Sequence, residues 1–285
     1  MFSSEHNFKI KQLDGEIIDL YEAGVMVLGF DDPIPELTYF EETAEGIEGY
    51  IDMGAEYQGR TPSARFYIEA RDYIAWSLEL QKVYRLFKSY EPFYIIRDVQ
   101  PGKRLLVRRA GGFLPALEPG YAGEFAISFK SPSPYWESIA DTSEPIDFNS
   151  HLWAIGMGFE TDKHYQYKFT GSSFAGINFT VHNPGDADLD PRKFNRRLKM
   201  IIKGSFQTLQ LTNETTGESF RYTGGLQEGE ELVIDGVKVL KNGMSVFSNT
   251  NRAFISLKKG ENHIMLRGVT NPGYSVEIVT KFYYL

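Results

Sequence analysis

The last third of the chain alternates apolar and polar residues in short runs, and a turn sequence closes each run. Residues 209–212 lead into a polar turn at 213–217, and residues 232–234 run into Asp235-Gly236. Asn, Asp and Gly between alternating runs are a strong short-range signal of β-hairpins. Because alternation places every second side chain on one face of a strand, this pattern predicts strands with one buried face.

Short strands are expected at regular intervals throughout the second half. The candidates are residues 174–181, 197–202, 209–212, 232–234, 237–240, 253–257, 263–267 and 274–284. Turns at Asn242-Gly243, Lys259-Gly260 and Asn271-Pro272-Gly273 separate several of them. Many short strands with regularly spaced turns favour a β-sandwich or jelly roll.

The first half also reads as strands, except for one segment with helical spacing. Strands are expected at residues 8–13, 16–20, 25–30, 65–70, 93–96, 104–109 and 121–129. The apolar residues of the exceptional segment recur at roughly helical intervals: Ile74, Leu78, Val83, Leu86 and Phe87. Asp72 can cap this helix and Glu91-Pro92 can end it. We therefore predict a helix near residues 72–88, with Leu78, Val83, Leu86 and Phe87 packed on the sheet.

The length of 285 residues allows two domains of ordinary size. A polar stretch at residues 140–149 indicates a linker. We expect one domain over residues 1–146 and a second over residues 147–285. The aromatic share of 14% suits pleated sheets, where rings fit half-buried surfaces.

Charge is divided unevenly between the two halves. Residues 1–146 carry 14 basic and 24 acidic side chains, a net −10, whereas residues 147–285 carry 16 basic and 14 acidic ones, a net +2. Residues 31–56 hold nine carboxylates and no Lys or Arg. Nucleic-acid binding by the first half is disfavoured, because neutralising phosphates needs positive charge.

Two interpretations of this acidic run remain open. Charged runs most often form solvated loops. The run could instead form a wall that faces DNA without binding it. The apolar residues between the carboxylates favour packing over disorder; they are Ile34, Leu37, Tyr39, Phe40, Ile47 and Tyr50.

The residues that catalysis and metal binding require are missing or scattered. The chain has no cysteine, which excludes disulfides, thiolate metal sites and thiol nucleophiles. None of the five histidines forms a metal pair at helical spacing; they are His6, His151, His164, His182 and His263. No dinucleotide, phosphate-loop or Gly-x-Ser-x-Gly motif is present. We therefore expect no catalytic, cofactor-binding or metal-binding residues, and no enzyme.

Asp186, Asp188 and Asp190 resemble the start of a calcium-binding loop. Pro191 stands where such loops have glycine, and Arg197 stands where they have a bidentate glutamate. An Asp-rich connection between strands is therefore expected rather than a metal site.

A basic cluster follows directly, made of Arg192, Lys193, Arg196, Arg197, Lys199 and Lys203. Its last three residues alternate with Leu198, Met200 and Ile202, which makes them the solvent face of one strand. A solvated or partner-facing surface is favoured over nucleic-acid binding.

No apolar run approaches the roughly 18 residues of a membrane span. The N-terminus lacks the basic and apolar regions of a signal peptide, which favours synthesis in the cytosol.

Several short motifs follow one another along nearly the whole chain. In the first half they are residues 72–76, 91–94, and 125–129 followed by Ser131-Pro132. In the second half they are residues 183–186, Gly204, 213–217, Gly229-Glu230 and 257–262. In this order they resemble the distal tail proteins of phages with long, non-contractile tails (siphophages), especially those of Gram-positive hosts.

This resemblance implies an N-terminal split β-barrel domain that assembles into a hexameric ring, and a C-terminal galectin-like sandwich outside it. The ring would join the tail tube to tail-associated and receptor-binding proteins at the virion tail tip. The protein would be made in the cytoplasm of the bacterial host, and DNA would pass through the ring without specific binding. On this basis Glu41, Glu42, Glu45 and Glu48 are expected to line the channel. The family has no catalytic residues.

Two other functions remain open. Galectin-like sandwiches can bind sugars, so a carbohydrate-binding module for attachment to the host cell wall is the first. However, Trp76, Trp136 and Trp153 all lie outside the C-terminal strands. A tail-associated hydrolase is the second, and its carboxylate pair cannot be selected among 38 acidic residues without a fold.

Overall fold

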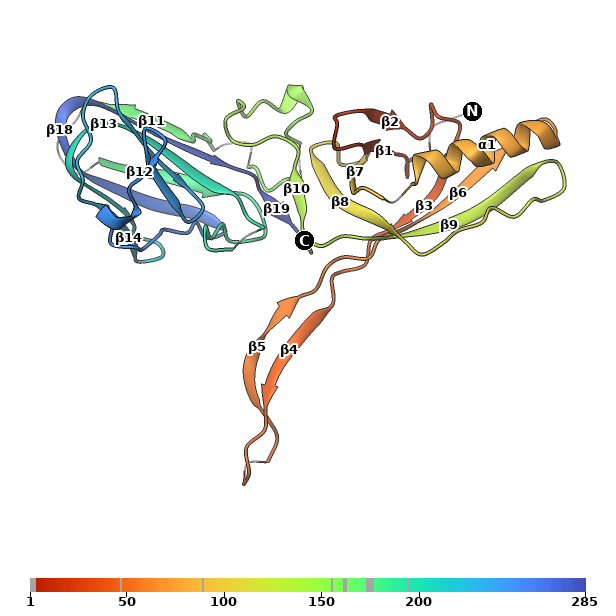
Figure 1. Cartoon of the computed structure of the whole chain (residues 1–285), viewed down its shortest axis with the longest axis horizontal. Helices are drawn as coiled ribbons and strands as arrows, with labels where there is room; N and C mark the ends of the chain where they lie inside the picture. Colours follow the sequence, from red (N-terminus) through yellow and green to blue (C-terminus); the bar gives the residue numbers. More distant parts are fainter. Residues whose placement is uncertain are drawn as a thin grey trace. The chain divides into compact units, whose positions relative to one another are not determined.

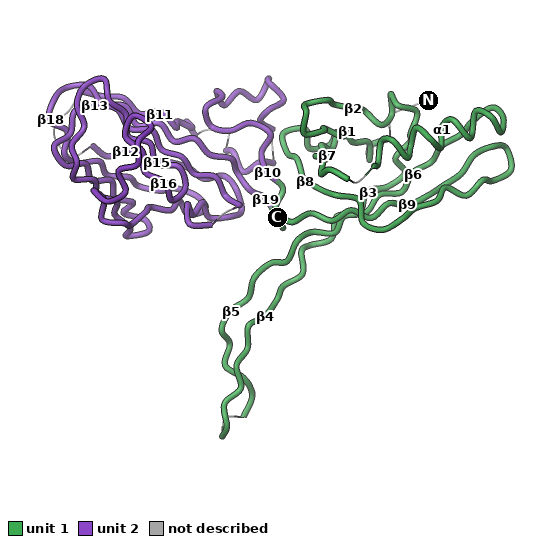
Figure 2. The backbone as a smooth tube through the Cα atoms, viewed as in Figure 1, with its two compact units in different colours: residues 1–136, 285 green, residues 137–284 purple. Residues whose placement is uncertain are grey.

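The computed structural model describes residues 4–46, 48–88, 90–154, 156–160, 163–172, 177–193 and 195–285. The chain forms two compact units, residues 1–136 with Leu285 and residues 137–284 (Figure 2). Antiparallel strands dominate both units, and the described residues contain a single α-helix. The expected class, mainly β with one or two helices, is therefore confirmed. No helix in the described ranges is long and apolar enough to cross a membrane.

The first unit is built on one curved antiparallel sheet. Its strands are β1 (Phe8–Lys11), β2 (Ile17–Asp19), β3 (Met26–Asp31), β6 (Ser63–Glu69), β7 (Phe93–Arg97), β8 (Lys103–Ala110) and β9 (Ala122–Lys130). Their order across the sheet is β2-β1-β7-β8-β9-β6-β3. The start of β8 pairs with β7 and its end with β9, so β8 passes from one partner to the next. Strict alternation of buried and exposed residues along β9 gives the sheet one inner face.

Phenylalanine rings fill that inner face. Six buried rings contact one another with centroids between 5.1 and 6.5 Å apart: Phe8, Phe30, Phe66, Phe87, Phe93 and Phe129. Several of these pairs meet edge to face, an arrangement that rings prefer over a direct sandwich. These phenylalanine rings thus form much of the core of the first unit.

Helix α1 (Tyr73–Leu86) covers one side of this core (Figure 1). The Asp72 carboxylate caps it by accepting a hydrogen bond of 2.8 Å from the N–H of Ala75, as expected. Val83 and Leu86 are buried on its inner face, and Phe87 is buried directly after it. The helix therefore packs on the sheet as predicted at its C-terminal half.

The prediction was wrong for the N-terminal half of α1. Ile74 and Leu78 are exposed at 74% and 61%, and Trp76 is buried in their place. The terminal ring atom of Trp76 lies so close to Gly123 of β9 that a Cβ atom there would be 2.8 Å from it. The large indole therefore determines which face of the first helical turns points inward.

The described residues of the second unit form nine whole strands, and β10 (Trp136–Ser138) begins in the first unit and ends in the second. The nine are β11 (Lys168–Gly171), β12 (Ile177–Asn183), β13 (Leu198–Asn213), β14 (Glu218–Tyr222), β15 (Glu231–Asp235), β16 (Lys238–Lys241), β17 (Met244–Ser245), β18 (Gly260–Thr280) and β19 (Tyr283–Tyr284). Two short 3₁₀ turns, Phe148–Ser150 and Phe247–Asn249, lie between them.

Two long strands, β13 and β18, pass through both halves of the sandwich. Their outer segments pair with β12 and β14 in one half, and with β11 and β15 in the other. Phe220 of the first half and Leu198, Met200 and Ile234 of the second border one small internal space, so the two inner faces meet. The strands change register between Gly204 and Phe206, and again between Phe206 and Gln210. Such irregularities bend strands where they move between sheets.

Several strand predictions are corrected by these bends. Residues 197–202 and 209–212 belong to the single strand β13, and residues 263–267 and most of 274–284 lie in β18 or β19. Asn271-Pro272-Gly273 lies within β18 and does not separate two strands. Residues 253–257 form no named strand. Of the candidate at 174–181, residues 174–176 lie outside the described ranges.

The division of the chain into compact units falls between Trp136 and Glu137, whereas the polar stretch had suggested a boundary between residues 146 and 147. Residues 137–142 are hydrogen bonded into the second unit. The N–H of Ser138 donates to the carbonyl of Phe282, and the hydroxyl of Thr142 donates to the carbonyl of Ile278 over 2.6 Å. Hydrogen bonding to β18 and its C-terminal neighbours thus holds this stretch in place.

Candidate functional site

Between β3 and β6 the chain leaves the sheet of the first unit and forms a separate hairpin. β4 (Leu37–Glu42) pairs with β5 (Ile51–Tyr57), and no other described strand joins this two-stranded sheet. The hairpin and its turn, called the arm below, project from the body of the first unit (Figures 1 and 2). Because an isolated two-stranded hairpin is at best marginally stable in water, the arm gains from support outside its own strands.

The apolar residues of the arm face solvent. Tyr39 and Met53 are 63% and 62% exposed. The exposed apolar residues are Ile34, which lies three residues before β4, and Leu37, Tyr39, Phe40, Tyr50, Ile51, Met53 and Tyr57. The described residues that the sequence expected to pack are therefore exposed, and Ile47 lies outside the described residues. An exposed apolar surface of this kind is typical of an interaction site.

Carboxylates gather on the same hairpin. Glu41 and Glu42 end β4, while Glu45 and Glu48 lie in the turn at the far end, and all four are exposed. Glu41 stands directly opposite Asp52 across the two strands. Like charges directly opposite each other destabilise a strand pair. None of these carboxylates forms an ion pair with a described Lys or Arg. The arm therefore carries negative charge that no described Lys or Arg side chain compensates by an ion pair.

Two residues that sequence analysis did not single out hold the base of the arm. Asp32 lies just before the arm and Arg60 just after it, and their side chains form an ion pair of 2.8 Å. Arg60 is only 3% exposed. The missed signal was the single arginine that follows a run of nine carboxylates.

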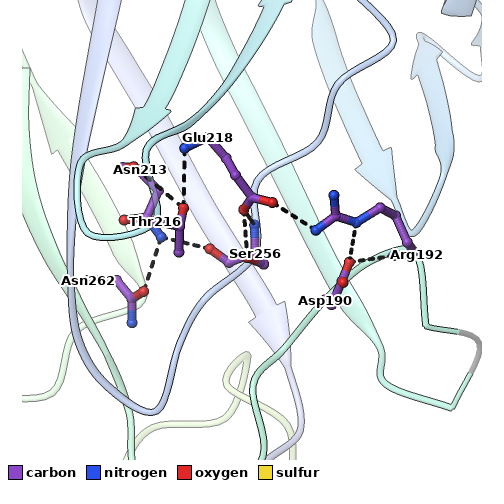
Figure 3. A network of polar contacts seen from close by, with 7 residues as sticks. All are labelled: Asp190, Arg192, Asn213, Thr216, Glu218, Ser256 and Asn262. Carbon is purple, nitrogen blue, oxygen red and sulfur yellow. Dashed lines mark hydrogen bonds and ion pairs between the residues drawn. The ribbon is translucent and has the colours of Figure 1, made fainter. Parts of the chain in front are cut away.

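A polar network joins three loops of the second unit (Figure 3). Arg192 Nε donates to Asp190 Oδ1 and Arg192 Nη2 to Glu218 Oε1, each over 2.7 Å. The other oxygen of Glu218 accepts from the N–H of Ser256 over 2.7 Å and from its hydroxyl over 2.5 Å. Arg192 and Glu218 thereby tie the aspartate-rich loop to β14 and to the segment before β18.

Two buried asparagines complete this network (Figure 3). Asn213 Nδ2 donates to the carbonyl of Ser256 over 2.6 Å and to Asn262 Oδ1 over 3.0 Å. Asn262 Nδ2 in turn donates to the carbonyls of Lys258 and Gly260. The motifs at 213–217 and 257–262 therefore hold loops together, a structural role.

The charges of the network are fixed by these contacts. Partial burial raises the pKa of Glu218, but hydrogen bonds from Ser256 and Arg192 outweigh it and leave that pKa below its ordinary value. In the same way, hydrogen bonds from Arg192 overcome partial burial and lower the pKa of Asp190. A general acid needs a raised pKa, so these two carboxylates are unsuited to that role at neutral pH.

The aspartate-rich loop is held by contacts within the protein. Lys259 donates from its N–H to Asp188 and from Nζ to Asp186, over 2.9 and 2.8 Å. Within the described ranges, no group of three or more His, Asp or Glu side chains is arranged to hold a metal ion. These aspartates therefore serve as an internal connection.

Three of the six residues of the basic cluster are paired with carboxylates or carbonyls. Besides Arg192, Lys203 forms an ion pair with Glu231 over 3.3 Å, and Arg196 donates to the carbonyl of Asp188. Leu198, Met200 and Ile202 are buried along β13 while the residues between them are partly exposed, as the alternation predicted. All three tryptophans are at most 4% exposed, so none offers a stacking surface to a sugar ring.

Comparison with known proteins relates this arrangement to phage tails. Residues 26–131 match the family model described as the phage tail protein RIFT-related domain. Over nearly its whole length the chain is similar to the Dit protein of phage SPP1. The TM-score is 0.59 at 11% identity, over 96% of this chain and 99% of that one. The SPP1 protein is described as a paradigm of the hub adsorption apparatus in phages that infect Gram-positive bacteria.

Two structures of the phage P2 baseplate in its activated conformation, with Ca and with Sr, are more distant. Their TM-scores are 0.42 and 0.43 at 9% identity, over 97% of this chain and 98% and 97% of those chains. No curated protein matches the sequence. The resemblance to distal tail proteins is confirmed by the domain at residues 26–131 and by the fold of the chain.

Proposed function

We infer that this protein is a structural hub at the tip of a phage tail, because it has the fold of the siphophage distal tail proteins and carries a phage-tail domain. Six copies form a ring, with the first unit as its ring-forming part and the second as an outer sandwich. The ring joins the tail tube protein to tail-associated and receptor-binding proteins. The protein is made in the cytoplasm of the bacterial host and is incorporated into the virion.

The arm is the observation that carries the ring proposal. Its apolar side chains are exposed, and both edges of its two-stranded sheet lack a strand partner among the described residues. A neighbouring copy supplies what the arm lacks, namely apolar surface to cover its rings and backbone groups to pair with its edges. A copy that offers its own arm on one side and receives an arm on the other makes a head-to-tail contact. Repeated contacts of this type form a ring when the rotation from one copy to the next closes, and we propose that it closes after six copies.

We further propose that Glu41, Glu42, Glu45 and Glu48 line the channel of this ring. Phage DNA leaves through the tail tip, and a basic wall would hold it by releasing counterions. A wall of carboxylates repels the phosphate backbone, and at physiological salt this repulsion still acts over about 8 Å. DNA therefore passes without being bound.

A charge-neutralising variant tests the channel proposal. Glu41→Gln, Glu42→Gln, Glu45→Gln and Glu48→Gln together should leave folding nearly unchanged, because exposed charges contribute little to stability. Ring formation at low ionic strength should strengthen, since like charges on six subunits no longer repel one another. DNA ejection from reconstituted particles should slow. Mass measurement across a salt series and an ejection assay give the two readouts.

The matched control changes four other exposed carboxylates of the first unit to Gln: Glu5, Glu16, Glu22 and Glu91. It alters net charge equally but leaves the arm intact. Equal effects of the two variants, or a ring with the four arm residues on its outer rim, would contradict the channel proposal.

The proposal assigns the chain no enzymatic activity and no sugar-binding site. Buried tryptophans and the lowered pKa values of Asp190 and Glu218 support this choice. A glycan array with the purified protein tests the carbohydrate-binding alternative, and a cell-wall degradation assay tests the hydrolase. Binding or degradation at levels comparable to a positive control would require a different function.

A further inference from the structure

The base of the arm contains a buried polar cluster of three side chains from separate parts of the first unit. Asp32 Oδ2 accepts a hydrogen bond from Arg60 Nη1 over 2.8 Å and another from Trp136 Nε1 over 2.9 Å. Arg60 Nε donates to the carbonyl of Pro134 over 3.0 Å. Arg60 and Trp136 are 3% and 4% exposed. We call Asp32, Arg60 and Trp136 the arm-base cluster.

The cluster contains one residue from each of the two segments that connect the arm to the sheet. Asp32 follows β3 and precedes β4, whereas Arg60 follows β5 and precedes β6. One ion pair therefore joins the segment that enters the arm to the segment that leaves it. Trp136 links this pair to the core, because its ring contacts Phe30 at 6.3 Å and Phe30 contacts Phe8 at 5.5 Å.

The backbone beside the cluster is closely packed as well. The N–H of Ser131 donates to the carbonyl of Arg60 over 2.8 Å. A Cβ atom at Gly59 would lie 2.3 Å from the carbonyl oxygen of Ser131, so only glycine permits this approach. The hydroxyls of Ser131 and Ser133 donate to the carbonyls of Ser133 and Tyr135, which stiffens the segment that receives Arg60.

The energetics of a buried ion pair suit a role in fixing the direction of the arm better than a role in stabilising the fold. Removing an arginine and a carboxylate from water costs several kcal/mol per ion, and apolar residues of similar size often serve stability equally well or better. The other Asp32 oxygen, Oδ1, is buried, and no described group donates a hydrogen bond to it. A planar guanidinium and a carboxylate, however, meet in a narrow range of orientations. Apolar contacts impose no comparable restriction on direction.

We propose that the arm-base cluster consists of positioning residues, which fix the direction in which the arm leaves the first unit. Its value for assembly rests on the proposed ring, because an arm must point at its neighbour before it can dock. The direction of the arm in a single protomer does not depend on the ring. The two claims can therefore be tested separately.

The absence of cysteine makes a distance measurement direct, since introduced cysteines are the only labelling sites. Glu45→Cys at the tip of the arm and Ala126→Cys on the exposed face of β9 carry a pair of spin labels. Pulsed electron paramagnetic resonance then gives the distribution of tip-to-body distances. Dilution with excess unlabelled protein removes distances between copies.

Two variants in this background separate direction from stability. Asp32→Leu with Arg60→Met replaces the ion pair by apolar side chains, and Trp136→Phe keeps a buried ring while removing the N–H donor. Both should broaden the distance distribution and reduce the ring population seen by mass measurement. The apolar double variant should unfold at the same temperature as the parent or higher. A third variant, Arg60→Lys, keeps the charge but loses the planar guanidinium, and it should also broaden the distance distribution.

Each outcome decides one claim. An unchanged distance distribution in both folded variants overturns the positioning role, even when the parent forms rings. A broadened distribution in variants of a parent that is monomeric at every concentration supports the positioning role and contradicts the proposed ring. The apolar double variant could instead unfold at a temperature far below that of the parent, while the Trp136→Phe variant keeps the parent's distance distribution. That result would mean that the cluster stabilises the fold and does not position the arm, and it would also overturn the inference.

Discussion

Leu86 and Leu78 lie eight residues apart on the same helix in opposite environments. Leu86 is 8% exposed and Leu78 is 61% exposed. Leu86→Ala should lower the free energy of unfolding by about 2–5 kcal/mol, because it removes buried methyl groups and leaves a cavity. Leu78→Ala should change it by no more than about 0.5 kcal/mol. Urea unfolding of the two variants checks this, and equal losses would contradict the assigned inner face.

These two leucines also show what residue spacing can and cannot predict. Spacing placed a helix near residues 72–88 and identified Val83, Leu86 and Phe87 as buried, because they recur on one helical face. It could not show that Trp76 would occupy the inner position of the first turns. That outcome depends on Gly123, which lies on β9 and makes room for the indole. A contact between residues so far apart in the sequence produces no pattern in the spacing of neighbouring residues.

Glu218 should make the second unit sensitive to acid. Its folded pKa lies below the ordinary value of 4.5, so its stabilising contribution is complete above about pH 4.5 and is lost as the pH falls through the folded pKa. Glu218→Gln should lower the free energy of unfolding by about 1–3 kcal/mol near neutral pH. The difference from wild type should shrink in acid, where the wild-type carboxylate is protonated too.

Urea unfolding at about pH 7 and at about pH 3 measures this difference. Glu214→Gln is the matched control, because Glu214 lies in the turn just before β14 but is exposed. A Glu218→Gln effect of equal size at both pH values would contradict the charge-based account of the network.

Among the elements, the two long strands depend on glycines where they bend. Gly268 has φ of +95°, and a Cβ atom there would lie 1.8 Å from the carbonyl oxygen of Thr208. Gly243 has a similar φ of +82° but nothing within 4 Å. Both substitutions to Ala impose left-handed strain, and Gly268→Ala adds a collision with backbone. Gly268→Ala should therefore cost at least about 1–3 kcal/mol more than Gly243→Ala. Thermal unfolding of both variants compares them, and equal losses would contradict the close approach.

The same elements explain which strands the sequence misassigned. Asn271-Pro272-Gly273 is a turn signal that predicted separate strands on its two sides, and separate strands were likewise predicted at residues 197–202 and 209–212. A bulge inside a long strand uses the same residue types as a turn. Only the pairing of β13 with β18 along both halves distinguishes the two cases. The arm was missed for a related reason, because its exposed apolar and acidic residues do not alternate as a half-buried strand would.

At the scale of the whole molecule, periodicity predicted the mainly β class with one helix. The regular turns predicted a sandwich in the second half, and the fold bears out both. The candidate channel residues Glu41, Glu42, Glu45 and Glu48 were identifiable as an acidic run, and the structure brings them to the end of one hairpin. Their common position could not be predicted, because it follows from the arm. Their place in an assembly depends on neighbouring copies and stays a prediction.

Self-association through the arm is the central claim, and the mass of the full-length protein in solution tests it most directly. A ring of six chains of 32.5 kDa has a mass of about 195 kDa. Tyr39→Ser, Phe40→Ser and Ile51→Ser together remove exposed apolar surface from the arm and should yield a monomer. Val237→Ser, Met244→Ser and Phe148→Ser remove similar surface from the second unit and should leave the ring intact. Analytical ultracentrifugation should give the ring mass for the wild type and the second-unit variant and the monomer mass for the arm variant. A monomeric wild type, or an arm variant that keeps the wild-type mass, would contradict the account.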